Sequence, residues 1–166
     1  TLYDGLMEAG QEFGIVDFGL RALDSLRLER GCPTWGKDLT TGTSPFDAGL
    51  EDCLQPDKGE FAGRQGLLEH ERAGVTRKLA CLTVDVEGSD AWIWGGEPVS
   101  SAGRTVGLLS SAGYGHVAGK SIGLAYLPSE LTVPGTALKV EIAGRHWPAA
   151  VVAPPLIEPT NGRAAA

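Results

Sequence analysis

One arginine stands out among the residues whose types and spacing could do chemistry. Arg27 lies within residues 19–31, where leucines recur at the spacing of an amphipathic helix. On such a helix Leu20, Leu23 and Leu26 share one side, and Arg27 projects among them. A guanidinium is always charged, so its place on an apolar face requires an anionic or strongly accepting partner.

Two kinds of partner for Arg27 are compatible with the sequence. A ligand with an acidic or accepting group would make this residue part of a binding site. Alternatively, a carboxylate of the same protein would pair with it and hold the long irregular segment after the helix; the candidates are Asp24, Asp38 and Asp47. The opposite side of the helix is predicted to face solvent and consists of Arg21, Ser25 and Glu29.

The sequence contains no phosphate-binding glycine motif, no metal-ligand pattern and no nucleophile elbow. We therefore name no catalytic residue and no metal ligand. His116 lies in the glycine-rich residues 110–120. This segment either lines a binding site or is a flexible connector between strands. Trp92 and Trp94 are predicted to cover the core of the β-rich part, whereas their exposure would favour an interaction surface.

Composition and charge exclude several classes of partner. With a net charge of −7 and scattered basic residues, the chain lacks the clustered Lys and Arg that bind nucleic acid. No apolar run approaches the ~18 residues that span a bilayer, and no signal peptide opens the sequence. Three cysteines without metal-ligand spacing indicate a reducing, cytoplasmic location and are predicted to be free and buried: Cys32, Cys53 and Cys81.

The hydrophobic pattern changes from helical to strand-like near residue 75. Before it, the spacing predicts helices that end near residues 13, 30 and 73, each followed by a glycine. After it, apolar and β-branched runs predict six strands, at residues 78–86, 97–101, 104–109, 121–127, 137–143 and 146–152. Six short strands with tight turns favour a small closed antiparallel barrel, because closure leaves no exposed edge.

The chain is therefore predicted to be an α+β protein in two parts. Residues 1–75 form an α-rich part, residues 76–153 form the β-barrel, and residues 154–166 form a surface tail. The sequence has no initial Met and enters directly into helical spacing. We therefore expect it to be cut from a longer protein.

Several blocks of sequence occur in a recognisable order. They are Ala-Leu-Asp-Ser-Leu-Arg-Leu-Glu-Arg-Gly at residues 22–31, Trp-Gly-Lys-Asp at 35–38, and Thr-Ser-Pro-Phe-Asp-Ala-Gly-Leu at 43–50. In this order they resemble the tetrahydrofolate-dependent aminomethyltransferases, the family of the glycine cleavage T-protein. Two further blocks, at residues 57–64 and 112–126, resemble the variant fused to the C-terminus of flavin-dependent dimethylglycine and sarcosine dehydrogenases.

The resemblance implies three domains around a central hole that holds folate, with a small β-barrel at the C-terminus. This chain would be the end of the α/β folate-binding domain followed by that antiparallel barrel. The family's folate-contacting arginine lies in Leu-Arg-Leu-Glu, which is Arg27 here, and an aromatic residue of its Tyr-Gly-x-Asp turn corresponds to Trp35. Together with one residue of the glycine-rich block, the candidate cofactor-binding residues are Arg27, Trp35, Asp38 and Tyr114.

The activity that the resemblance implies is transfer of a one-carbon unit from a methylated-amine-derived substrate to tetrahydrofolate. The expected partners are folate, that substrate (dimethylglycine, sarcosine or a glycine-derived adduct), and the rest of a longer chain or a partner subunit. FAD is expected only if a dehydrogenase domain lies upstream, and the chain alone is expected to be inactive. The alternative is a non-catalytic barrel that closes the folate site or docks a partner subunit.

Overall fold

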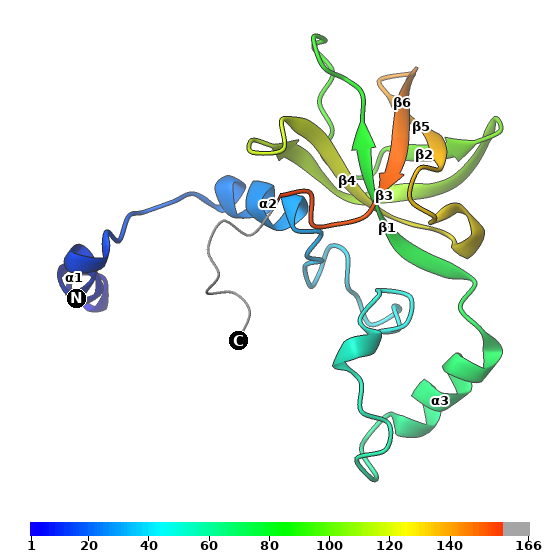
Figure 1. The fold of residues 1–166 in the computed structure, drawn as a ribbon, viewed down its shortest axis with the longest axis horizontal. Coiled ribbons are helices and arrows are strands. Elements are labelled where there is room, and N and C mark those ends of the chain that lie inside the picture. Colours follow the sequence, from blue (N-terminus) through cyan, green and yellow to red (C-terminus); the bar gives the residue numbers. More distant parts are fainter. Residues whose placement is uncertain (158–166) are drawn as a thin grey trace.

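The structure, a computed structural model, describes residues 1–157. Its helices are α1 (Leu2–Gly10), α2 (Leu20–Glu29) and α3 (Arg64–Ala73), with short 3₁₀ turns at Gln11–Phe13, Glu51–Cys53 and Ser129–Leu131. Its strands are β1 (Arg77–Val84), β2 (Pro98–Ser101), β3 (Arg104–Gly115), β4 (Lys120–Pro128), β5 (Ala137–Ile142) and β6 (Arg145–Val152). Figure 1 shows α2 beside the strands, whereas α1 and α3 lie apart from them.

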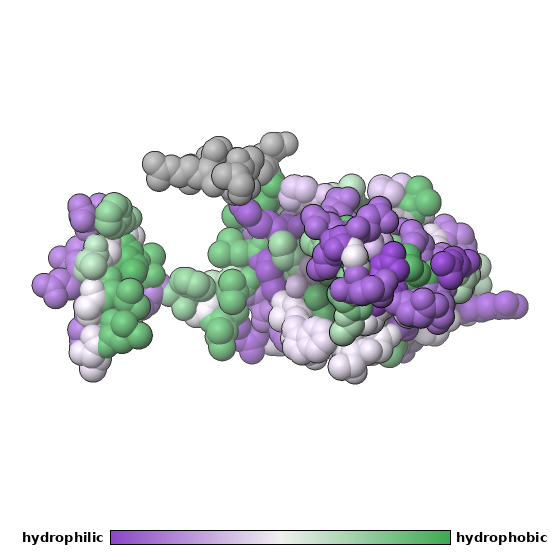
Figure 2. Space-filling view, turned by 90° about the horizontal axis from the view of Figure 1, so that it is seen from below, coloured by the Kyte–Doolittle hydropathy of each residue, from purple (hydrophilic) through white to green (hydrophobic). Residues whose placement is uncertain are grey.

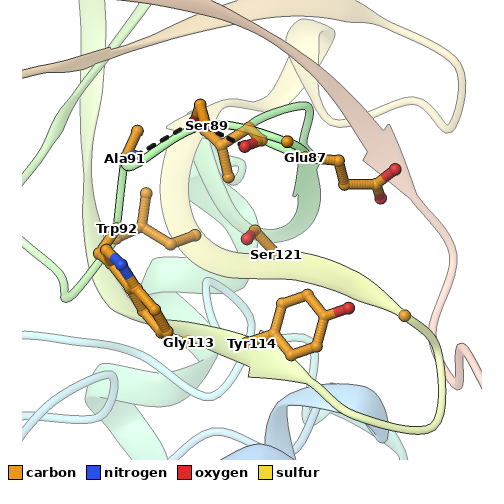
Figure 3. A pocket seen from close by; sticks show the side chains of 11 residues that line it. Glu87, Ser89, Ala91, Trp92, Gly113, Tyr114 and Ser121 are labelled. Atoms are coloured by element: carbon orange, nitrogen blue, oxygen red, sulfur yellow. Dashed lines mark hydrogen bonds between the residues drawn. The ribbon is translucent and has the colours of Figure 1, made fainter.

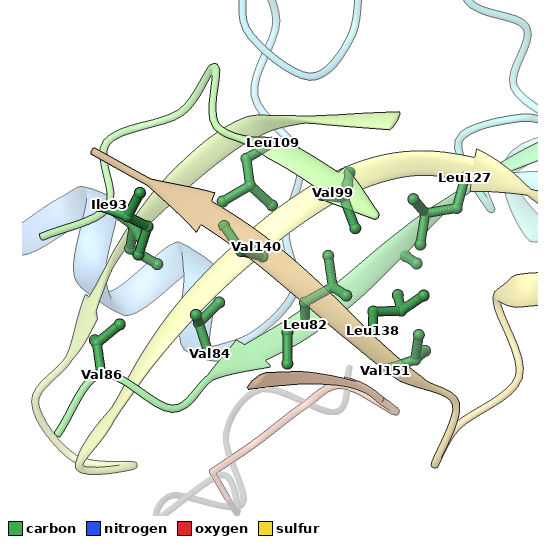
Figure 4. Packing of buried hydrophobic residues seen from close by; sticks show 14 residues of the cluster. Leu82, Val84, Val86, Ile93, Val99, Leu109, Leu127, Leu138, Val140 and Val151 are labelled. Atoms are coloured by element: carbon green, nitrogen blue, oxygen red, sulfur yellow. The ribbon is translucent and has the colours of Figure 1, made fainter. Parts of the chain in front are cut away.

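The strands close into an antiparallel barrel in the order β1-β4-β3-β2-β5-β6. The predicted small antiparallel barrel is therefore confirmed. Alternate side chains point inward, as in β5, where Leu138, Val140 and Ile142 are buried. Figure 4 shows that apolar side chains from all six strands fill the interior. Since every strand has two neighbours, the barrel has no free edge.

β3 is longer than predicted, because its glycines allow close packing and do not form a loop. The predicted strand ended at residue 109, whereas β3 continues to Gly115. A Cβ on Gly115 would lie 2.8 Å from Cγ of Glu29, and one on Gly113 would lie 3.1 Å from Cδ1 of Leu28. Both neighbours belong to α2, so the glycines let this helix lie directly against the strand.

Helix α2 turns a different face inward from the one that its leucines predict. The buried face consists of Ser25, Leu28 and Glu29, and the leucines predicted to be buried are exposed: Leu20, Leu23 and Leu26. Leu28 packs against Ile122 and Leu124 of β4. Ser25 and Glu29 are buried because the end of β3 and the following turn offer backbone groups to their side chains. Periodicity identifies the most apolar face of the helix. The face that packs against the barrel is instead the one whose polar side chains find hydrogen-bond partners there.

An apolar surface extends from α1 to the beginning of α2. Figure 2 shows hydrophobic side chains on one side of α1 and along the segment that leads to α2. Its exposed members include Leu2, Leu6, Phe13, Val16, Phe18 and Leu20. Monomeric proteins rarely expose so continuous an apolar surface.

The predicted tail begins after β6. Residues 154–157 follow this strand, and residues 158–166 lie outside the described residues. Within the described part, no helix has the length and hydropathy needed to cross a bilayer. The assignment of residues 1–75 and 76–153 to separate domains stays a prediction.

All three cysteines are free, but only one of them is buried. Cys81 lies in the β1 wall of the barrel, whereas Cys32 and Cys53 are exposed. The prediction that all three are buried is therefore wrong for two of them. Both belong to the irregular segment between α2 and α3, which lies outside the barrel wall.

We expect Leu28→Ala to lower the free energy of unfolding by about 2–5 kcal/mol, because it would leave a cavity between α2 and the barrel. Leu23→Ala on the exposed side of the same helix is the matched control and should change it by no more than about 0.5 kcal/mol. Urea unfolding followed by tryptophan fluorescence measures both. Equal losses would contradict the orientation of α2.

We expect Cys32 and Cys53 to react with a thiol reagent at pH 8 in the folded protein, and Cys81 to react only after denaturation. Burial raises the pKa of the Cys81 thiol to about 11, so the reactive thiolate is scarce there. Ellman titration before and after addition of guanidinium measures the difference. Rapid reaction of the folded Cys32→Ser/Cys53→Ser variant would show that Cys81 is accessible.

Candidate functional site

Arg27 is held in a network that joins α2 to the following turn and to β3. Its Nε donates to Asp24 at 2.7 Å, and its Nη1 donates to Asp38 at 3.0 Å and to the Cys32 carbonyl at 3.3 Å. Its Nη2 donates to Ser111 Oγ at 2.9 Å. Four of the five guanidinium N–H groups therefore have protein partners. The sequence left two kinds of partner possible for Arg27, a ligand or a carboxylate of the same protein. In the structure Arg27 pairs with carboxylates of the same protein.

Asp38 is the buried centre of this network. Its side chain is fully shielded from solvent, and it also accepts hydrogen bonds from the Thr34 backbone N–H at 2.9 Å and from Ser110 Oγ. The Tyr126 hydroxyl donates to the Asp38 carbonyl at 3.0 Å. The bonds from Arg27, Thr34 and Ser110 to the carboxylate offset its desolvation, which one ion pair alone does not repay. Asp38 thereby fixes its turn against β3 and β4.

Asp24 connects the network to the surface. Its carboxylate is shared between Arg27 and Lys37, whose Nζ lies 3.2 Å from Oδ2. The hydrogen bond from Arg27 lowers the pKa of Asp24 below its ordinary value of 3.8. Asp24 is therefore negatively charged at neutral pH and bridges two cations.

Two side chains of α2 hold the turn between β3 and β4. Ser25 Oγ donates to the Tyr114 carbonyl at 2.8 Å, and Glu29 Oε1 accepts from the backbone N–H groups of Val117 and Ala118 at 2.7 and 2.9 Å. Glu29 is fully buried, and its Oε2 has no hydrogen-bond partner among the described residues. Through these bonds α2 positions the end of β3, including Tyr114.

Two adjoining hollows open beside this turn. The first, which we name the barrel-mouth hollow, has a volume of about 400 Å³ and is lined by Trp92, Ile93, Tyr114, Glu87 and Ser121, among others. Figure 3 shows Trp92 and Tyr114 on opposite sides of this hollow, with Ser121 between them. Aromatic walls with a few polar groups are typical of sites for flat organic ligands.

The second hollow, which we name the α2 groove, lies between α2 and the barrel and has a volume of about 450 Å³. It shares Trp92, Ile93, Gly113 and Tyr114 with the barrel-mouth hollow. The Arg21 guanidinium carbon lies 4.9 Å from the centre of the Trp94 ring, within cation–π range. The His116 and Tyr114 rings meet edge to face at 5.1 Å. The α2 groove thus joins aromatic walls to cationic side chains.

Trp92 and Trp94 do not cover the barrel core, so the expectation from the sequence is wrong. Ile93 is buried, whereas the two tryptophans are 66% and 62% exposed. In an extended segment neighbouring side chains point to opposite sides, so only Ile93 enters the barrel. The Trp-Ile-Trp alternation was the sequence signal that could have identified the two indoles as walls of a site.

The four predicted cofactor-binding residues fall into separate places. Arg27 and Asp38 are bonded to each other inside the network, and Tyr114 lines both hollows. Trp35 is 69% exposed on the turn that Asp38 fixes, away from the lining of either hollow. His116, for which the sequence left a site lining open, lines the α2 groove. Folate binding by the four residues stays a prediction.

Two family models match the sequence. One, described as the GCVT N-terminal domain, matches residues 1–58. The other, described as the glycine cleavage T-protein C-terminal barrel domain, matches residues 77–158. Together they span both the segment with α1 and α2 and the closed barrel.

Curated proteins and a solved structure agree with these models. Mouse dimethylglycine dehydrogenase is 39% identical over 98% of this chain and 19% of its own length. An aminomethyltransferase of Moorella thermoacetica is 36% identical over 92% of this chain and 41% of its own length. The crystal structure of aminomethyltransferase T from Bartonella henselae has a TM-score of 0.77 and 29% identity, over 84% of this chain and 39% of that one. The chain therefore spans only 19% to 41% of the length of these relatives.

We expect Arg27→Met to lower the free energy of unfolding by about 3–5 kcal/mol, because it would leave Asp38 buried without its cation. Arg30→Met is the matched control, because Arg30 directly follows α2 and is exposed. This substitution should lower the free energy of unfolding by less than about 0.5 kcal/mol. Denaturant unfolding at pH 7 measures both. An Arg27→Met protein of unchanged stability would show that the network is dispensable.

Proposed function

Because this chain belongs to the glycine cleavage T-protein family, we propose that the protein carrying it passes a one-carbon unit from a methylated-amine-derived substrate to tetrahydrofolate. The donor in this proposal is dimethylglycine, sarcosine or a glycine-derived adduct. Residues 1–75 are the end of the folate-binding domain, and residues 76–153 are the barrel that closes the site. FAD takes part only where a dehydrogenase domain is present on the same protein.

The observation that carries this proposal is the pair of aromatic hollows at the junction of α2 and the barrel. Their shape and lining fit a flat ring system, because Trp92 and Tyr114 provide apolar walls and Ser121 provides a hydroxyl. The buried Ile93 adds an apolar side chain to the lining of both hollows. Tetrahydrofolate, when bound, supplies the acceptor for the one-carbon unit.

In this proposal the four candidate residues act in different ways. Tyr114 contacts the ligand directly, because it lines both hollows. Arg27 and Asp38 hold α2 and its turn in place, and Arg27 offers the ligand its one remaining N–H group. Trp35 provides an aromatic surface on the fixed turn, where it meets a ligand that extends beyond the two hollows.

The apolar surface on α1 supports a proposed partner, the rest of a longer chain or a second subunit. Leu6, Phe13 and Phe18 belong to this surface, and burial of each apolar side chain stabilises association. The location that we propose is the cytoplasm, on the basis of the free cysteines.

One observation favours a second candidate function, a non-catalytic module that docks a partner subunit. Trp92 and Trp94 are both exposed, and paired tryptophans are enriched at the centres of protein interfaces. In that case the tryptophans would be covered by protein and not by a folate.

We expect the complete protein that carries this chain to bind 5-formyltetrahydrofolate, with quenching of its tryptophan fluorescence. Tyr114→Ala should weaken binding about two- to tenfold, as expected for loss of one aromatic contact. Tyr3→Ala, on α1, is the matched control and should leave the affinity unchanged. Absence of binding by the wild-type protein, together with a stable complex through Trp92 and Trp94, would favour the docking module.

A further inference from the structure

The barrel-mouth hollow has one charged side chain in its lining, and that charge is negative. Among the described residues that line it, Glu87 is acidic and none is a lysine, an arginine or a histidine. Glu87 forms no ion pair within residues 1–157. The surface on the other side of Glu87 adds Asp85 and Lys120, whose opposite charges cancel. The hollow therefore attracts a cation and repels an anion.

Two aromatic rings face this hollow from opposite sides. Trp92 and Tyr114 lie across it from each other, with Ser121 between them (Figure 3). The electron-rich face of an aromatic ring attracts a cation, and the indole of tryptophan does so most strongly. Aromatic rings around a nitrogen cation are the arrangement by which proteins recognise quaternary and methylated ammonium groups. The walls and the charge of the hollow thus favour the same class of ligand.

The loop that carries Glu87 and Trp92 is held in place without a ligand. Val86 and Ile93 anchor it, because both side chains are buried in the barrel interior. Ser89 closes the turn next to Glu87, since its backbone N–H and its hydroxyl both donate to the Val86 carbonyl, at 3.2 and 2.6 Å. A site whose groups are already in position loses less conformational entropy when it binds a ligand.

The lining favours a methylated ammonium group over a primary one. A primary ammonium group has three N–H donors, and each needs an acceptor when water is removed. The one charged acceptor in the described lining is the Glu87 carboxylate, and the Ser89 hydroxyl is already bonded within its own loop. Methyl groups on the nitrogen remove donors and add apolar surface, which packs against Trp92 and Ile93.

We propose that the barrel-mouth hollow binds the methylated ammonium group of a small amine, with Trp92 and Tyr114 as its walls and Glu87 as its counter-charge. This inference rests on the proposed function for the identity of the amine, which is the donor of the one-carbon unit. Transfer requires that donor and acceptor meet, and the two adjoining hollows share the Trp92 and Tyr114 rings. A volume of about 400 Å³ exceeds the needs of a small amine, so a ring of the acceptor has room along the same walls.

The test uses the complete protein and radiolabelled choline, which carries a trimethylammonium group and no carboxylate. We expect equilibrium dialysis to show saturable binding of choline. The neutral alcohol 3,3-dimethylbutan-1-ol has a carbon in place of the choline nitrogen, so it should compete at least about tenfold less well. Unlabelled dimethylglycine should displace choline, whereas glycine, a primary amine, should not.

Substitutions in the loop measure the wall and the charge separately. Trp92→Ala should weaken choline binding about tenfold, and Trp92→Phe by about two- to threefold, because a smaller ring remains. Glu87→Gln should weaken it about three- to tenfold. Asp90→Asn is the matched control, because Asp90 is an exposed carboxylate of the same loop outside the lining, and it should bind choline as the wild type does. Since Trp92 and Glu87 are exposed, their substitution leaves the fold intact.

The outcomes separate this site from the proposed function. Failure of the wild type to bind choline, or equal competition by the neutral alcohol, would overturn the ammonium site. Equal weakening in Glu87→Gln and Asp90→Asn would also overturn it, because it would indicate general attraction to an acidic surface. Choline binding that dimethylglycine does not reverse would overturn the assignment to the donor. Normal choline binding by a protein that does not bind 5-formyltetrahydrofolate would overturn the proposed function and leave the ammonium site in place.

Discussion

The buried pair of Arg27 and Asp38 is the interaction on which the arrangement of this protein depends. The buried Asp38 carboxylate accepts hydrogen bonds from Arg27 of α2 and Ser110 of β3, and the backbone carbonyl of the same residue accepts one from Tyr126 of β4. Desolvation of the two charges offsets most of their attraction, so the main effect of the pair is to fix the position of α2 and its turn. The pair thereby holds α2 and the turn after it against the barrel.

Close approach of the backbone makes this arrangement possible. The glycines at 113 and 115 remove the side chains that would keep α2 away from β3. Ser25 and Glu29 then reach the backbone of the strand and the turn, and Leu28 enters the apolar cluster behind them. The polar and the apolar contacts therefore favour the same orientation of α2. The two aromatic hollows lie beside the helix and the end of β3.

The two hollows divide the chemistry of the site between them. The barrel-mouth hollow has a carboxylate, Glu87, and a hydroxyl, Ser121, whereas the α2 groove has the cations Arg21 and Lys37 and one carboxylate, Asp24. Both share the Trp92 and Tyr114 rings.

The sequence by itself determined the barrel and the family, because strand alternation and sequence blocks are local signals, and it gave Asp38 as one of three candidate carboxylate partners of Arg27. It did not determine the inward face of α2, the length of β3, or the exposure of Trp92 and Trp94. Those depend on contacts between distant segments, such as the bond from Arg27 to Ser111, which joins residues 84 positions apart. Helical periodicity reports which face is apolar, but only the tertiary structure decides which face finds partners for its polar groups.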